Sequence, residues 1–150
     1  MNYLRGISFN IPNEYGNVLE KILYKFDVKK YNWYISDIDI YNCDDKNDFS
    51  SGLISGISFD NSLNSINNQY IVAITLMAFN GEFAPIVNYN DFKKSNCDLV
   101  VLISDSVFVE IYCKNKDDIE KLKNNALNFG FTNIEYITKE NDKRNVFTVS

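Results

Sequence analysis

The sequence predicts an α+β fold in which two amphipathic helices pack on a mainly antiparallel sheet. Two stretches repeat apolar residues every three or four positions, and several others alternate apolar and polar residues or are apolar throughout. The order of these stretches is too irregular for a doubly wound fold. The 150 residues fit one ordinary domain, so we expect residues 1–150 to form a single domain.

The N-terminal third is expected to contain a strand, a helix and one or two further strands. Residues 7–11 alternate apolar and polar side chains, as a half-buried strand does. Residues 12–27 carry apolar side chains at helical spacing after a proline, which predicts an amphipathic helix. Residues 31–40 are aromatic and then alternating, which predicts strand.

Residues 44–68 lose this periodicity and fill with Asp, Asn, Ser and Gly, so we expect a long polar loop with room for one short element. Long loops in compact domains often carry function. Two near-continuous apolar runs follow, 70–79 and 99–103, as expected of central strands. Ser104–Ser106 then predicts a tight hairpin to a strand over 107–113.

The C-terminal part predicts one more helix and two strands. Residues 117–129 place apolar side chains on one helical face, with Gly130 as a C-terminal cap. Residues 134–138 alternate like a strand, and 146–149 are expected to close the chain as another, after a turn at 140–143.

The absence of histidine excludes many catalytic and metal sites. Without imidazole the chain cannot build a Ser-His-Asp or Cys-His pair, nor a zinc site that uses histidine. It also has no glycine-rich phosphate loop, and we predict no cofactor. The cysteines, Cys43, Cys97 and Cys113, are too far apart for a metal motif, and Cys113 falls on an apolar strand face, so we expect a buried structural thiol there.

Charge and composition point to a cytoplasmic protein that binds neither nucleic acid nor membrane. The net charge is −5 and the lysines are interleaved with acidic residues, so no basic patch is expected. The longest apolar run, 70–79, is about half the ~20 residues that cross a bilayer as a helix. No secretory signal is recognised at the N-terminus, and three cysteines at irregular spacing suit a reducing compartment.

Two groups of residues are candidates for a site. The densest acidic cluster could bind a hard cation or act in acid–base chemistry, although a solvated loop is the commoner fate of such residues; its members are Asp37, Asp39, Asp44, Asp45 and Asp48. Aromatic residues of the same region could form a surface for a protein partner, although core packing is again commoner. The members expected to be exposed are Tyr31, Phe49 and Tyr89.

Several stretches together carry a resemblance to a known family: Arg5–Phe9, Ile11–Gly16, Tyr31–Ile35, Ile103–Val107, Ile111–Lys114 and Phe131–Thr138. On these stretches the chain resembles a domain-of-unknown-function family of small proteins from low-GC Gram-positive bacteria. The similarity covers nearly the whole chain except residues 44–68. The resemblance implies a bacterial cytoplasmic single domain, and it implies no activity and no site residues.

The function that the sequence favours is a non-enzymatic protein-binding module of the inhibitor, immunity or regulatory type. The missing catalytic groups, the acidity and the polar loop with nearby aromatic residues favour it over catalysis. The alternative is a small enzyme, or a ligand or metal sensor, that uses the acidic segment 37–48. An exposed edge strand could also form a homodimer by sheet extension, although no residue demands it.

Overall fold

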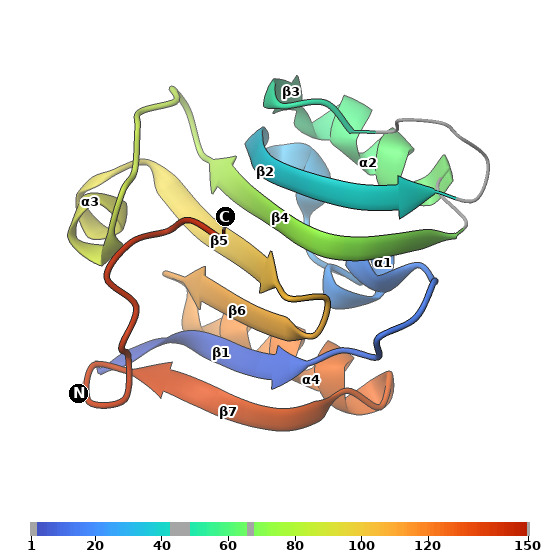
Figure 1. Ribbon diagram of the computed structural model, residues 1–150. Coiled ribbons are helices and arrows are strands. Elements are labelled where there is room, and N and C mark those ends of the chain that lie inside the picture. Colours follow the sequence, from blue (N-terminus) through green and yellow to red (C-terminus); the bar gives the residue numbers. More distant parts are fainter. Residues whose placement is uncertain (1–2, 43–48, 66–67, 150) are drawn as a thin grey trace.

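One antiparallel sheet runs through the part of the chain that the structure describes, residues 3–42, 49–65 and 68–149 of a computed structural model (Figure 1). The strand order is β3-β2-β4-β5-β6-β1-β7, and each strand runs opposite to its neighbours. The strands are β1 (Leu4–Asn10), β2 (Asn32–Asn42), β3 (Gly52–Ser55), β4 (Gln69–Phe79), β5 (Cys97–Ser104), β6 (Phe108–Cys113) and β7 (Thr132–Thr138).

Three of the helices cover one face of this sheet and lie behind it in Figure 1. Helix α4 packs on β1, β6 and β7, α1 packs against α4 and α2, and α2 packs on β2 and β3. Helix α3 contacts β5 and contributes Phe92 to a separate cluster on the opposite face. The helices are α1 (Val18–Ile22), the 3-10 helix η1 (Val28–Lys30), α2 (Gly56–Ser65), α3 (Tyr89–Lys94) and α4 (Lys116–Asn128). None of them combines the length and apolar character that crossing a bilayer requires.

The sheet is buried on both faces at its centre. Side chains that alternate toward the helices, such as Ile7 and Phe9 of β1, form the larger core. The opposite face carries a second cluster, built around Val100, Leu102 and Tyr112. Because β4 and β5 contribute to both clusters, their sequences are apolar almost without interruption.

The predicted fold class is confirmed, and so are the second helix and the hairpin. Helix α4 begins after Asn115, whose side-chain Oδ1 accepts a hydrogen bond from the Asp118 amide at 3.1 Å, and it ends before Gly130 at φ +77°. The turn residues Asp105 and Ser106 both have positive φ, 51° and 67°, as a two-residue hairpin of the favoured twist requires.

The helix expected within residues 12–27 is much shorter, since α1 covers only Val18–Ile22. At its start the backbone of Gly16 pairs with Gln69, which keeps the preceding residues out of the helix. At its end the buried amide of Asn125 donates to the carbonyl oxygens of Ile22 and Tyr24, at 3.0 and 2.6 Å. The tertiary hydrogen bonds from α4 replace the helical ones that would continue α1.

Two further expectations are wrong. The stretch 44–68 is not one long loop, because it contains β3 and all of α2. Helix α2 buries only Gly56, Phe59 and Leu63, too few apolar positions to produce a clear helical pattern. Residues 146–149 do not form a strand: they end a C-terminal segment, residues 139–149, that crosses the second face of the sheet without joining its ladder.

Gly6 is required where β1 approaches β6 most closely. A Cβ atom at this position would lie 1.7 Å from the backbone oxygen of Ile111. Since that neighbour is the backbone of a central strand, it cannot move aside without breaking the ladder.

We therefore expect Gly6→Ala to lower the free energy of unfolding by about 3 kcal/mol, measured by urea denaturation. Gly16→Ala is the matched control, because its Cβ would have no atom within 4 Å, and it should change stability by less than about 0.5 kcal/mol. Equal effects of the two substitutions would contradict the close approach.

Candidate functional site

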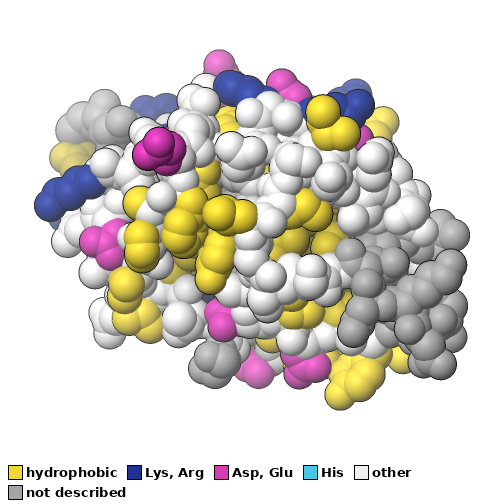
Figure 2. Space-filling model, turned by 90° about the horizontal axis from the view of Figure 1, so that it is seen from above, with side chains coloured by type: hydrophobic (Ala, Val, Ile, Leu, Met, Phe, Trp, Pro, Cys, Tyr) yellow, Lys and Arg dark blue, Asp and Glu magenta, His cyan; other side chains and the backbone are white. Residues whose placement is uncertain are grey.

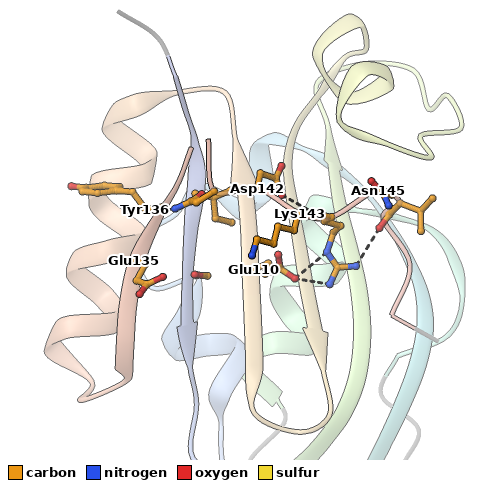
Figure 3. Close-up of a pocket in the computed structure, with 11 residues that line it drawn as sticks. Glu110, Glu135, Tyr136, Asp142, Lys143 and Asn145 are labelled. Atoms are coloured by element: carbon orange, nitrogen blue, oxygen red, sulfur yellow. Dashed lines mark hydrogen bonds and ion pairs between the residues drawn. The ribbon is translucent and has the colours of Figure 1, made fainter. Parts of the chain in front are cut away.

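A groove lies on the second face of the sheet, over β6, β1 and β7, where neither α3 nor a helix of the opposite layer covers it. Two adjoining cavities of about 540 and 550 Å³ form it, and Ser8, Glu110 and Glu135 line both. Residues of the C-terminal segment wall the first cavity; Figure 3 labels Asp142, Lys143 and Asn145 among them. We call the two cavities together the open groove.

The floor of the open groove is a row of three residues in register. Glu110 of β6 pairs with Ser8 of β1, which pairs in turn with Glu135 of β7. With neighbouring strands about 4.8 Å apart, the Cα atoms of the two glutamates lie about 10 Å from each other. Two carboxylates therefore flank one serine hydroxyl on a rigid surface.

Arginine 144 neutralises one of these carboxylates. Its Nε and Nη2 donate to Oε1 of Glu110 at 2.9 and 2.5 Å, and less than a third of each side chain is exposed. The dashed lines in Figure 3 mark this pair. The third nitrogen, Nη1, donates to the carbonyl oxygens of Val146 and Thr148. One guanidinium thus folds the C-terminal segment and fastens it to β6.

A second junction forms at Asp142, which belongs to the same segment. Its Oδ2 accepts from Nη1 of Arg5 at 2.9 Å, and its Oδ1 accepts from the hydroxyl of Tyr112 at 2.8 Å and the amide of Arg144 at 3.2 Å. Burial raises the pKa of Tyr112 well above its usual value, and the hydrogen bond to Asp142 raises it further. Arg5 therefore reaches from the sheet to the C-terminal segment, and Arg144 reaches from the segment to the sheet.

Apolar contacts and a distant carboxylate hold the end of the C-terminal segment. The ring of Phe147 lies on Tyr112, with centroids 4.8 Å apart, and its amide donates to the carbonyl of Val87 at 2.8 Å. The amide of Val149 donates to Oδ2 of Asp37 at 3.4 Å. The segment is thus bound at both ends and forms a fixed wall of the open groove.

The side chains of the open groove that could contact another molecule are those not already bonded within the protein. The carboxylate of Glu135 is exposed and has no hydrogen-bond or ion-pair partner among the described residues. Phe108, which also lines the second cavity, is 51% exposed. Amide and hydroxyl side chains surround them, from Asn10, Asn133 and Ser104. This combination suits contact with a cationic and an apolar group together.

The exposure that the sequence suggested for the aromatic candidates is wrong for two of them. Tyr31 and Phe49 are 5% and 7% exposed and belong to the larger core, where Tyr31 stacks on Phe26 and Phe49 contacts Phe59. Tyr89 is half-buried and packs under the guanidinium of Arg5, 4.0 Å from the ring centroid. These rings stabilise the fold because a seven-stranded sheet offers two faces to cover.

The acidic candidates are not brought together as far as the structure describes them. Asp37 accepts hydrogen bonds from Thr75 and Val149, and Asp39 is exposed on the same strand. The remaining three lie outside the described residues: Asp44, Asp45 and Asp48. Within the described residues, no three acidic or thiol side chains are grouped so that they could hold a metal ion. A metal site in segment 37–48 stays a prediction.

The described thiols are buried and protonated. Cys97 has no measurable exposure and Cys113 is 4% exposed, which confirms the structural role expected for Cys113. Burial raises the pKa of each to about 12, so neither is a thiolate near neutral pH.

Sequence reasoning missed the open groove, although one signal for it was present. Glu110, Glu135 and Asp142 look like any other acidic residues in an acidic chain. Arginine, however, occurs only at positions 5 and 144, against 13 lysines. Arg144 makes several hydrogen bonds with one planar guanidinium, and Arg5 combines an ion pair to Asp142 with stacking on the ring of Tyr89, which lysine cannot do in the same geometry.

The chain belongs to a family described as proteins of unknown function (DUF2691), whose model matches residues 4–148. It is 41% identical over 152 residues to the uncharacterized protein YncE of Bacillus subtilis, in an alignment that covers 97% of this chain and 99% of that protein. The comparison with solved structures finds no match. The expected resemblance to a low-GC Gram-positive family is confirmed.

Removing the guanidinium should loosen the C-terminal segment. We expect Arg144→Ala to lower the free energy of unfolding by about 2 kcal/mol, because Glu110 loses charged hydrogen bonds in a partly buried place. Hydrogen exchange at the amide of Phe147 should accelerate by more than the loss of global stability alone explains. Lys143→Ala, at the exposed neighbouring residue, should leave both measurements near wild type.

The raised pKa of Tyr112 predicts a specific pH dependence. A phenol whose pKa is higher in the folded state stabilises the fold fully below its unfolded pKa of about 10, and this contribution declines as the pH rises above that value. Tyr112→Phe should lose about 1 kcal/mol at pH 7 and then fall less steeply than wild type above pH ~10. Tyr41→Phe, at an exposed ring, should keep the wild-type slope in alkaline urea titrations.

Proposed function

We propose that this protein is a non-enzymatic binding module, of the inhibitor, immunity or regulatory type, that holds a segment of a partner protein in the open groove. One observation carries the proposal: a single solvent-open cavity on the sheet is lined by an exposed aromatic ring, Phe108, and by a carboxylate, Glu135, that is unpaired among the described residues. Aromatic side chains are enriched in the cores of protein interfaces, and charged groups there select a partner of opposite charge.

Binding is favoured over catalysis because the strongest polar groups near the groove are already used in the fold. Glu110 is paired with Arg144, and Asp142 accepts three hydrogen bonds. Among the described residues, no second titratable side chain is hydrogen-bonded to Glu135. The groove therefore shows no paired general acid and general base there. A single carboxylate without a cationic partner among the described residues is suited to recognising a positive charge.

The charge of the surface indicates which partner segment would fit. The protein has a net charge of −5, and the second cavity of the groove contains Glu110 and Glu135 and no basic residue among its described lining. We therefore expect a segment with a lysine or arginine for Glu135 and an apolar side chain for Phe108. The proposal includes a cytoplasmic location, supported by two unpaired, buried thiols.

The proposal is tested by cross-linking in the native host. Benzoylphenylalanine, a photoreactive amino acid, replaces Phe108 in one variant and Leu127 of α4 in another; Leu127 is similarly exposed, at 55%, but lies on the helical layer. We expect one partner to be captured from position 108 and not from position 127. Glu135→Lys in the first variant should reduce the captured partner at least tenfold.

Two results would contradict the proposed function. One is capture from position 127 with none from position 108, which would move the interface to the helices. The other is capture from position 108 that Glu135→Lys leaves unchanged while circular dichroism reports an intact fold.

A further inference from the structure

The two edges of the sheet differ in how they are protected from further strand pairing. β7 carries the charged side chain of Glu135, and a residue with positive φ, Asn133, lies where its pairing with β1 shifts register. Among the described residues, β3 has the sequence Gly-Leu-Ile-Ser with no charged side chain, and it pairs with β2 alone. Charges are one of the usual means by which proteins block edge strands, and β3 carries none. Its first residue, Gly52, has a φ of 118°, so the regular part of this edge is Leu53 to Ser55.

Exposed apolar side chains lie beside this uncharged edge. Leu53 of β3 is 61% exposed, and Phe83, in the loop after β4, is 37% exposed. A groove of about 430 Å³ lies between β3 and this loop, lined by Asn32, Leu53, Ile54, Ser55, Gly81, Glu82 and Phe83. Figure 2 looks onto this end of the molecule and shows hydrophobic side chains gathered on its surface.

Leu53, Ser55 and Tyr34 lie on the same face of the sheet, beside this groove. Leu53 pairs with Tyr34, and the ring of Phe83 lies on Tyr34 with centroids 4.7 Å apart. Ser55 is two residues from Leu53 on the same strand and therefore points to the same face. A side chain that arrives opposite Ser55 on this face would thus lie beside the groove.

We propose that β3 pairs antiparallel with β3 of a second copy of this chain, about a two-fold axis at Ile54, so that one sheet continues through both copies. In an antiparallel pair centred on Ile54, the partner's Leu53 lies opposite Ser55. Leu53 of each copy then covers the groove beside Ser55 and Phe83 of the other. The exposed side chain and the groove that receives it are both part of one surface, which is what a two-fold interface requires.

Two copies of this chain can approach most easily where the surface carries little charge. Each copy carries a net charge of −5, so two copies repel over most of their surfaces. The groove beside β3 contains only one charged residue among its described lining, Glu82. This edge is separate from the open groove, which lies over the opposite end of the strand order, so both surfaces can be used at once.

Sedimentation velocity over a concentration series tests the proposal. We expect wild-type protein to reach twice the 17.4 kDa mass of one chain. Leu53→Asp should weaken the dimer at least tenfold, because each new carboxylate would enter a groove whose described lining holds Glu82 and no cation. Leu127→Asp is the matched control: it removes a similarly exposed leucine from α4 and should leave the dimer unchanged.

Disulfide trapping tests the register, in a Cys43→Ser background where the remaining native thiols are the buried Cys97 and Cys113. The Cα atoms of the two Ile54 residues would lie about 5 Å apart, within disulfide range, and those of the two Leu53 residues about 8 Å apart, beyond it. Ile54→Cys should cross-link under mild oxidation and Leu53→Cys should not.

A protein that stays monomeric at all concentrations, with no Ile54→Cys cross-link, would overturn the proposal. A dimer that survives Leu53→Asp would also overturn it, because that dimer must use another surface. Cross-linking through Leu53→Cys and not Ile54→Cys would contradict the axis at Ile54.

Discussion

The carboxylate of Asp142 is the group on which the arrangement of the second face depends. It receives Arg5 and Tyr112 from the sheet and the amide of Arg144 from its own segment, within 3.2 Å in each case. Only two per cent of the Asp142 side chain is exposed, so an unpaired carboxylate there would lower the free energy of unfolding. The three hydrogen bonds to Asp142 hold the chain after β7 on the sheet, so that it runs across the second face.

The path of the C-terminal segment divides the second face into a covered and an open part. Phe147 covers Tyr112 and completes the smaller core, while Arg144 ends the covered part by neutralising Glu110. Beyond that pair, Phe108 and Glu135 remain in solvent. The network that closes one half of the face therefore also shapes the half that we assign to partner binding. Stability and the proposed function thus use neighbouring residues of β6: Glu110 and Tyr112 hold the segment, and Phe108 faces the proposed partner.

The sequence predicted those parts of the fold that depend on local pattern. The apolar runs of β4 and β5, the amphipathic α4 and the hairpin at Asp105 need no distant partner to be recognised. The shortened α1 and the missed α2 depend on tertiary contacts, such as the amide of Asn125 on the carbonyls of α1. The open groove was missed for the same reason: Glu110 and Glu135 are 25 positions apart, and only the register through Ser8 aligns them.

The most direct measurement of the central claim is carboxyl footprinting of the protein, free and in the complex recovered from its host. Glu135, in the open groove, and Glu20, on α1, are both exposed in the free protein and should both react with a carbodiimide and an amine. The account predicts that the partner protects Glu135 and leaves Glu20 reactive. Protection of Glu20 with unchanged labelling of Glu135 would contradict it, because the partner would then bind the helical layer.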